Sequence, residues 1–377
     1  MGKSKEGVSH LVLLARERFN QMDQRALANT AHALAKLGYE DTNFMVELLA
    51  AAKPKLSSFT PQGLSTTAWA LGTLGHSDAM FMRALVVAAT SQLRNFKPQD
   101  MEDVASALAA LGHNDTAFMG TLLVAATAFM DALVVEAKSK LHSFRAQGLA
   151  NTAWALATLG HNDAAFMDAL LVAAQPQLRK LNPQELASTL WAVATLGHSN
   201  AAFVAALLVA AQPQLRSFNP QDLANTVWAL ATLGHVDTAF TGALLVEAQR
   251  KLPAFNEQNL ANTLSALAVL GHDDAAFVGA LLDAAETHLP SFDAEGLANT
   301  AWALATLGCV PREEAFTEAL VQAATSQLSN FTSHGLANTV WALATMGHVD
   351  TTFMGALLVQ AKLKLRRFSP QNLANTL

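Results

Sequence analysis

Histidine recurs at a fixed position throughout this 377-residue chain, and its imidazole can bind metals or transfer protons. Seven histidines directly follow a glycine: His76, His113, His161, His198, His235, His272 and His348. If each copy marks one packed helix, neighbouring copies lie about 10 Å apart, whereas the ligands of one zinc ion lie about 2 Å from the metal. We therefore interpret these histidines as residues at helix C-termini and expect no metal site.

Aspartates recur shortly after these histidines, and paired carboxylates could perform acid–base chemistry. Each of them precedes an apolar stretch, where N-capping of a helix explains it: Asp78, Asp115, Asp163, Asp237 and Asp350. The sequence contains no GxSxG, P-loop, HExxH or dinucleotide-binding motif. We expect no enzyme activity and no cofactor.

The recurring residues belong to copies of one unit, which is clearest in residues 219–252. Asn219 as N-cap, Pro220 at the first helical position and Gly234 as a C′ residue with positive φ predict a first helix, here called helix A. Asp237 predicts the start of a second helix, helix B, with apolar residues at spacings of three and four. Two such short helices bury their apolar faces only by stacking against neighbouring copies.

The glycines that end helix A recur mostly every 37 residues, from Gly38 to Gly347. This period predicts an all-α, right-handed α-solenoid of 37-residue helix-turn-helix repeats, with about nine full repeats plus terminal half-repeats. We expect a single array over residues 1–377, with a half-repeat cap at residues 1–22 and an incomplete C-terminal repeat. A duplication of 11 residues within residues 117–138 predicts that helix B of the third repeat is about three turns longer or split in two.

The cysteine count and the apolar runs indicate the compartment of the protein and whether it spans a membrane. Cys309 is the single cysteine, which fits a reducing compartment. The longest uninterrupted apolar run, Ala201–Ala211, is shorter than the ~18 residues that a membrane span requires. No secretory signal or transit peptide is visible. We therefore expect an intracellular protein without a membrane partner.

Charge is unevenly placed along the chain, although the formal net charge is −6. Basic residues gather between helix B and the next helix A, beside helix N-termini whose free N–H groups favour anions. The candidates for phosphate contact are Lys55, Arg94, Lys97, Lys140, Arg179, Lys180, Arg216, Arg250 and Lys251. Complementation of helix dipoles explains the same residues without a ligand. The negative total disfavours strong nonspecific nucleic-acid binding.

Two positions of helix A vary while their surroundings stay constant, and a helical wheel places both opposite the apolar arc. The first position precedes the first leucine of helix A, and its polar members are Asp100, Glu185, Asp222, Asn259 and Asn372, of which the first four are base-reading candidates. The second position lies three residues later and carries Asn29, Thr66, Asp103, Asn151, Ser188, Asn225, Asn262, Asn299 and Asn338. Such side chains can offer different donors and acceptors to a base edge, repeat by repeat. Neutral variation on a solvated face is the alternative.

All the tryptophans share one further position of helix A: Trp69, Trp154, Trp191, Trp228, Trp302 and Trp341. Ser106 and Ser265 replace tryptophan in two repeats. Because Trp228 neighbours small alanines on the helical wheel, we interpret the tryptophans as wedges between repeats rather than as platforms for base stacking.

The motif LANTxWALATLGH at this period resembles the octotricopeptide-repeat family of organellar RNA-binding proteins. It is also similar to the helical repeats of FAST-kinase-like proteins and of kinetoplastid RNA-editing-complex subunits. The resemblance implies an α-solenoid that binds RNA in mitochondria or chloroplasts and acts in its processing, stability or translation. The residues that match the family's variable positions are the Asp222 and Asn225 series. The Pro-Pro-Pro-Glu-Trp motif and the C-terminal RAP domain of such proteins are absent from this sequence.

The sequence therefore predicts sequence-selective binding of single-stranded RNA, with proteins of an RNA-processing complex as further partners. An armadillo-like or HEAT-like scaffold for protein–protein interaction is the alternative, and it accommodates the negative net charge better. It explains the two variable positions less well, because a ladder of asparagines that binds a peptide backbone has less reason to change.

Overall fold

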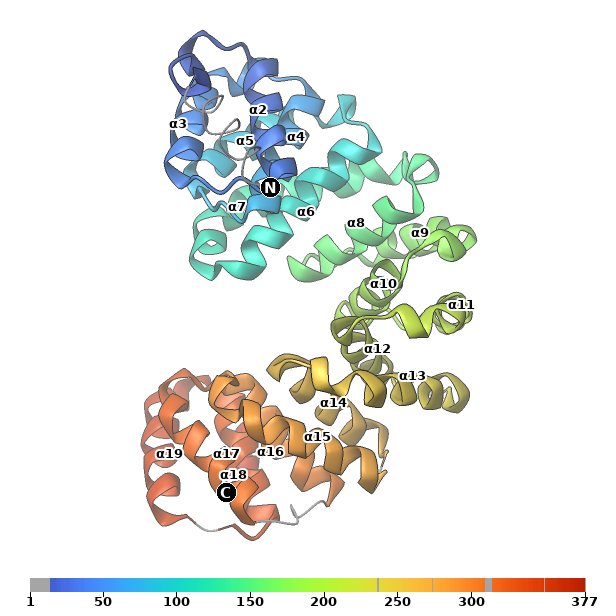
Figure 1. Cartoon of the computed structure of the whole chain (residues 1–377), viewed down its shortest axis with the longest axis vertical. Coiled ribbons are helices and arrows are strands. Elements are labelled where there is room, and N and C mark those ends of the chain that lie inside the picture. Colours follow the sequence, from blue (N-terminus) through green and yellow to red (C-terminus); the bar gives the residue numbers. More distant parts are fainter. Residues whose placement is uncertain (1–13, 236, 273, 309–313, 349, 377) are drawn as a thin grey trace, which may run out of the picture. The chain divides into compact units, whose positions relative to one another are not determined.

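The computed structural model describes residues 14–235, 237–272, 274–308, 314–348 and 350–376, and these residues form paired helices without a strand (Figure 1). The even-numbered helices are the predicted A helices: α2 (Gln24–Leu37), α4 (Pro61–Leu74), α6 (Pro98–Asn114), α8 (Ala146–Thr158), α10 (Pro183–Thr195), α12 (Pro220–Leu233), α14 (Glu257–Leu270), α16 (Ala294–Leu307), α18 (Ser333–Thr345) and α20 (Pro370–Thr376). The odd-numbered helices are the B helices: α3 (Thr42–Ala52), α5 (Ala79–Gln92), α7 (Thr116–Lys138), α9 (Ala164–Ala174), α11 (Ala201–Ala211), α13 (Thr238–Lys251), α15 (Ala275–His288), α17 (Glu314–Gln327) and α19 (Thr351–Lys364).

A connector joins each B helix to the next A helix and contains a short 3-10 helix. These are η2 (Lys53–Ser58), η3 (Leu93–Asn95), η4 (Leu141–Ser143), η5 (Gln175–Lys180), η6 (Gln212–Ser217), η7 (Leu252–Ala254), η8 (Leu289–Ser291), η9 (Leu328–Asn330) and η10 (Leu365–Arg367). Another 3-10 helix, η1 (Phe19–Gln21), precedes α2.

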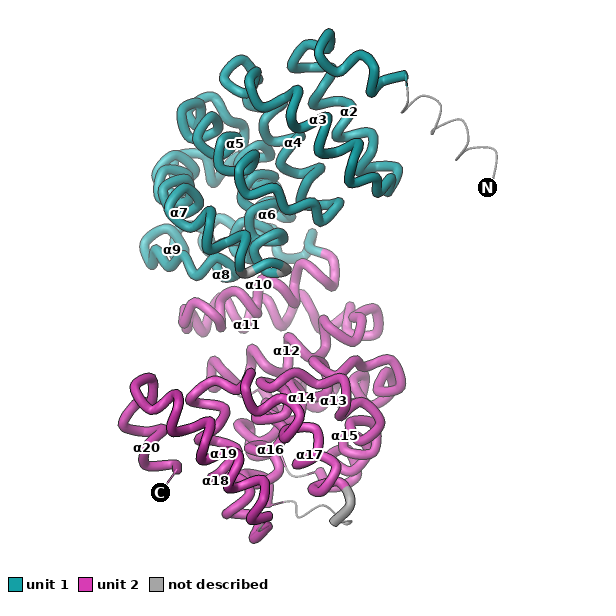
Figure 2. Tube along the Cα trace, turned by 90° about the vertical axis from the view of Figure 1, so that its left-hand side faces the viewer, with its two compact units in different colours: residues 1–181 teal, residues 182–377 magenta. Residues whose placement is uncertain are grey.

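The chain forms two compact units, residues 1–181 and residues 182–377 (Figure 2). In the first unit α2, α4, α6 and α8 pack side by side in chain order. In the second unit α10, α12, α14, α16, α18 and α20 do the same. B helices pack against their own A helix and mostly less extensively against neighbouring B helices, but α5 packs extensively against α7. The prediction of an all-α stack of helix pairs is confirmed.

Local signals set the helix ends as the sequence predicts, and α12 is representative. The Asn219 side chain accepts a hydrogen bond of 2.9 Å from the N–H of Asp222. Gly234 has φ 60° and its N–H donates to the carbonyl of Ala231, while the N–H of His235 donates to the carbonyl of Leu230 at 3.1 Å. The histidine position thus completes a Schellman motif, which satisfies carbonyls at the helix end. Helix B begins with Asp237, which accepts from the N–H of Phe240 at 2.9 Å.

The A helices are buried on more sides than the helical wheel suggests. Ala229 and Asp222 lie on the side opposite the apolar arc, yet they are only 0% and 5% exposed. Each interior A helix contacts two neighbouring A helices and its own B helix, so three sides are covered. The expected broad polar face is therefore wrong. What stays partly exposed is a narrow strip that includes Asn225 and Trp228.

The third repeat differs from the others as the duplication predicts. Helix α7 has 23 residues, against 14 in α5, and it is continuous. Gly112, however, does not end its A helix, because α6 continues through it to Asn114 and its φ is not positive. A Cβ at Gly112 would lie 2.3 Å from Cγ of Met119 in α7. The glycine here makes room for that methionine instead of forming a left-handed turn.

Among the described helices, α7 alone is long and apolar enough to cross a membrane by length and composition, with a mean hydropathy of 2.0 in an 18-residue window within residues 117–138. Its residues Phe118, Leu122, Phe129 and Met130 are buried, whereas Leu123, Val124 and Val135 are exposed. An uninterrupted apolar run is too strict a criterion to detect this helix from the sequence.

A half-repeat cap is expected at residues 1–22, and its residues 1–13 lie outside the described residues. Further along, Phe19 is buried and its ring centroid lies 4.8 Å from that of Phe44 in α3. Arg16 also forms an ion pair with Glu47 of the same helix. The described part of the cap thus covers the first full repeat.

Candidate nucleic-acid interface

The second variable position supplies one polar side chain from each A helix. In the second unit these residues are Ser188 (α10), Asn225 (α12), Asn262 (α14), Asn299 (α16) and Asn338 (α18), all on helices that pack side by side. The first four are partly exposed, whereas Asn338 is 8% exposed. We call this set the asparagine row of the second unit.

Three amides of this row are unoccupied. Within the part of the chain that the structure describes, the side chains of Asn225, Asn262 and Asn299 make no hydrogen bond. Ser188 instead donates to the carbonyl of Glu185 at 3.2 Å, and Nδ2 of Asn338 lies 3.0 Å from a ring nitrogen of His334. An unpaired amide keeps both a donor and an acceptor for a base edge.

The first unit carries a more varied row, namely Asn29, Thr66, Asp103 and Asn151. Asn29 is exposed, while Asn151 donates to Oε1 of Glu102 at 2.6 Å. Burial raises the pKa of Asp103 to about 6, although a hydrogen bond from Gln99 opposes the shift. At neutral pH Asp103 is therefore largely an acceptor-only carboxylate, which distinguishes the third repeat from the asparagine repeats.

The polar residues of the first variable position have a structural role that the sequence interpretation missed. One side-chain oxygen at this position accepts a hydrogen bond from the backbone N–H three residues earlier. The bond lengths are 2.9 Å for Asp100, 2.9 Å for Glu185, 3.0 Å for Asp222 and 3.3 Å for Asn259. This is the reciprocal half of a capping box. Asp100, Asp222 and Asn259 are also at most 6% exposed, and burial raises the pKa of Asp222. We therefore confine the base-reading candidates to the second position.

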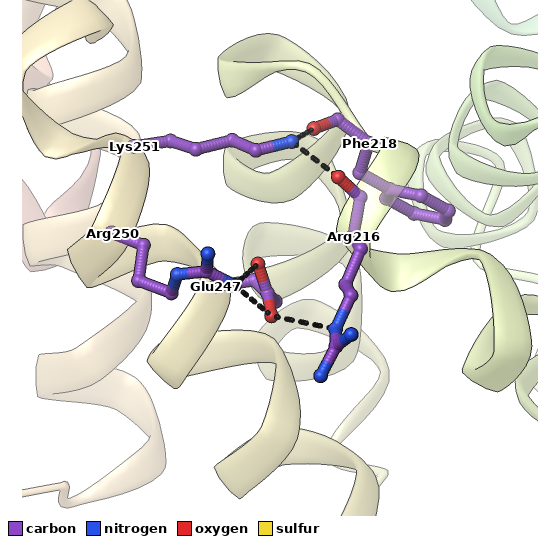
Figure 3. A network of polar contacts seen from close by, with 5 residues as sticks. All are labelled: Arg216, Phe218, Glu247, Arg250 and Lys251. Atoms are coloured by element: carbon purple, nitrogen blue, oxygen red, sulfur yellow. Dashed lines mark hydrogen bonds and ion pairs between the residues drawn. The ribbon is translucent and has the colours of Figure 1, made fainter.

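Three of the nine phosphate candidates donate hydrogen bonds to backbone carbonyls of the preceding repeat. Lys251 donates to the carbonyls of Arg216, at 2.7 Å, and Phe218 in the preceding connector (Figure 3). Lys55 and Lys140 make the same paired contact with the connectors before them. Glutamines occupy this position in other repeats and donate to the single phenylalanine carbonyl, as Gln92 and Gln177 do. We call this contact the connector latch.

The other six phosphate candidates differ in whether they have a polar partner within the protein. Arg216 and Arg250 flank the carboxylate of Glu247 at 3.9 and 3.1 Å, although their side chains are 87% and 64% exposed (Figure 3). The side chains of the remaining four candidates are exposed and make no polar contact with other described residues. These four are Arg94, Lys97, Arg179 and Lys180, all in the first unit.

The fold and this surface define a helical-repeat protein, and its described residues contain no group of three or more His, Cys, Asp or Glu that could hold a metal ion. The family model of the Tbc2 translation factor N-terminal domain matches residues 3–119, 112–237, 234–348 and 273–377. The chain therefore belongs to the family of Tbc2 translation factor N-terminal domains. This result confirms the coarser part of the predicted resemblance, a helical-repeat family.

No curated protein matches the sequence. Among solved structures, the chain is similar to one from a homology model of the full-length AP-3 complex in an intermediate open conformation, with 12% identity and a TM-score of 0.35, over 98% of this chain and 76% of that chain. It is also similar to a circular tandem repeat protein with a novel repeat topology, with 11% identity and a TM-score of 0.24, over 96% of this chain and 98% of that chain.

Proposed function

We propose that this chain binds single-stranded RNA through the second-position side chains of its A helices and acts in translation within an organelle. The observation that carries the proposal is the set of unpaired amides of Asn225, Asn262 and Asn299 on three successive A helices. Membership of a family named for a translation factor supports the cellular role. The resemblance to octotricopeptide repeats supports mitochondria or chloroplasts as the location.

The geometry favours single strands because base edges must reach a row of side chains spaced like packed helices, about 8 to 10 Å apart. A duplex hides its Watson–Crick edges, whereas an unpaired strand can splay its bases one by one. Each asparagine offers one acceptor and one amino group, so it can contact a base with two hydrogen bonds. Asp103 accepts only, and thus favours a base that presents an amino group. Changes at this one position therefore alter base preference without changing the framework.

Helix α14 contains a matched pair of asparagines for the test. Asn262 is partly exposed and unpaired, whereas Asn259 is 5% exposed and completes the capping box. Preferred sequences are first selected from a random RNA pool with the unaltered chain at ~50 mM salt. Affinities of N262A and N259A are then measured for the selected RNA and for its single-nucleotide variants. Thermal unfolding of both variants is followed in parallel.

We expect N262A to change preference at one nucleotide by roughly 1 to 3 kcal/mol, the range of one good base contact, and to keep its stability within about 0.5 kcal/mol. We expect N259A to lose roughly 0.5 to 2 kcal/mol of stability, as capping variants do, with base preference unchanged. Equal effects of the two variants on base preference would contradict the proposed reading position. A folded chain that retains no RNA but binds extended peptides would support the scaffold alternative instead.

A further inference from the structure

We infer that the tryptophan position of helix A is a stacking platform for the unpaired bases of a bound strand. The inference rests on the proposed RNA binding and adds an aromatic surface to the polar side chains of that site. All six tryptophans of the chain occupy this one position, three residues after the second variable position. Residues three apart lie one turn apart on the same helix face, so each indole borders a row side chain. Trp228 and Asn225 in α12 are one such pair.

The tryptophans are less deeply buried than the aromatic residues of the core. Every one of them is partly exposed, whereas the core is filled by phenylalanines such as Phe203 and Phe218, which are at most 1% exposed. The repeat that carries Ser265 builds an A helix of 14 residues, the same length as the helix that carries Trp228. The fold therefore forms without an indole at this position, and each tryptophan keeps an exposed part that a ligand can contact.

The surroundings of Trp69 indicate what such an indole can bind. The His32 ring centroid lies 5.0 Å from that of Trp69 at 43°, and Nζ of Lys36 lies 4.9 Å from the indole centroid. The chain thus places a flat heteroaromatic ring and a cation against this indole. Among the described residues, the neighbouring pairs Trp191 with Trp228 and Trp302 with Trp341 make no ring contact with each other. In these two pairs the indoles are therefore not stacked on one another.

The tryptophan position also borders the row residue of the following repeat. In α14 the hydroxyl of Ser265 donates to the backbone carbonyl of Asn299 in α16 at 3.4 Å. By the same spacing, Trp228 lies beside the helix segment that carries Asn262. A base that stacks on Trp228 would then present its edge to an unpaired amide. Stacking supplies affinity for any base and the amide supplies preference, which is the division expected for a strand-binding surface.

The test uses intrinsic fluorescence, because every tryptophan reports from this position. The full chain is titrated with single-stranded oligo(A), with oligo(A) as DNA, and with inorganic polyphosphate as an anion without bases. We expect both oligonucleotides to quench the emission and polyphosphate to leave it unchanged. Equal quenching by polyphosphate would overturn the inference, because it would show that charge rather than stacking perturbs the indoles.

Two reciprocal variants exchange the residues that the chain itself uses at this position. W228S copies the natural Ser265 repeat, and we expect it to weaken oligo(A) binding about 5- to 150-fold, the range for loss of one base stack. S265W should tighten oligo(A) binding, and such a gain in affinity cannot result from a loss of stability. W228F keeps an aromatic ring and should retain most of the affinity. Circular dichroism of each variant verifies the helical fold.

The outcomes separate this inference from the proposed function. RNA binding that is unchanged in W228S and S265W, without quenching, would leave the RNA function standing and overturn the stacking platform. A folded chain that binds no RNA would reject the proposed function itself. Quenching by an extended peptide without any response to oligo(A) would assign the surface to a protein ligand and overturn the inference.

Discussion

The connector latch provides a sharp test of which basic residues are structural. In the second unit Lys251 donates to two carbonyls of the preceding connector, 33 and 35 residues earlier in the chain. Its replacement by alanine leaves the carbonyls of Arg216 and Phe218 without these donors. Hydrogen bonds from a charged group contribute about 1.5 to 3 kcal/mol each when buried. The Lys251 side chain is partly exposed, so we expect K251A to lose about 1 to 3 kcal/mol in total.

A loss of this size shifts the Tm by about 2 to 10 °C in a unit of this length. K251Q is the matched control, because Gln92 and Gln177 make the equivalent contact at 3.1 and 3.2 Å. We expect K251Q to lose less than half as much stability as K251A. Thermal unfolding with parallel urea titrations measures both variants.

RNA affinity completes the test. K251Q removes the positive charge but keeps a donor, so a structural latch predicts unchanged binding and an unchanged salt dependence. If K251Q kept its stability but lost RNA affinity at every sequence, Lys251 would be a phosphate contact and the latch reasoning would be refuted.

Two further predictions concern the first unit. Eight repeats have alanine where the second has Gly72, yet a Cβ at Gly72 would lie 2.9 Å from Cα of Ala107. We therefore expect the free energy of unfolding of G72A, measured in urea titrations, to fall by about 1 to 3 kcal/mol. Gly120 has open space around it, so we expect G120A to raise the free energy of unfolding by about 0.5 to 1 kcal/mol. A stabilised G72A would show that α4 and α6 separate at no cost. Because the pKa of Asp103 is raised from 3.8 to about 6 in the folded chain, its ionisation destabilises the fold fully above pH about 6 and not at all below pH 3.8. We therefore expect D103N to be more stable than the unaltered chain at pH 7.5 and to lose most of that advantage by pH 4.5.

Much of the fold follows from local signals that each repeat restates. The Asn-Pro start of helix A, the glycine with positive φ at its end and the aspartate before helix B each act within a few residues. Such signals do not depend on distant packing, which is why the helix bounds could be predicted. Gly112 shows the limit: the same residue type sits inside α6, because Met119 of the lengthened α7 packs against it.

The candidate site was less predictable because it depends on contacts between repeats. A single-helix wheel treats each helix as having one buried side, whereas the A helices are flanked on both sides by others. Asp222 was therefore placed on a polar face that does not exist. A better signal was present in the sequence, since Asn219 and Asp222 have the spacing of a capping box. The alternation of lysine and glutamine at the latch position likewise favoured a donor over a phosphate contact.

The latch changes how the charge of this protein should be weighed. With all nine basic candidates on phosphates, the salt slope of binding to a single strand would reach about 6, at ~0.7 per contact. Of these nine candidates, four are exposed without a polar partner among the described residues, namely Arg94, Lys97, Arg179 and Lys180, which lowers that limit to about 3. A net charge of −6 also disfavours strong nonspecific attraction to phosphates. We therefore expect most of the affinity for RNA to come from base edges at the asparagine row and from stacking on the indoles. Both contributions depend weakly on salt and directly on which bases are unpaired.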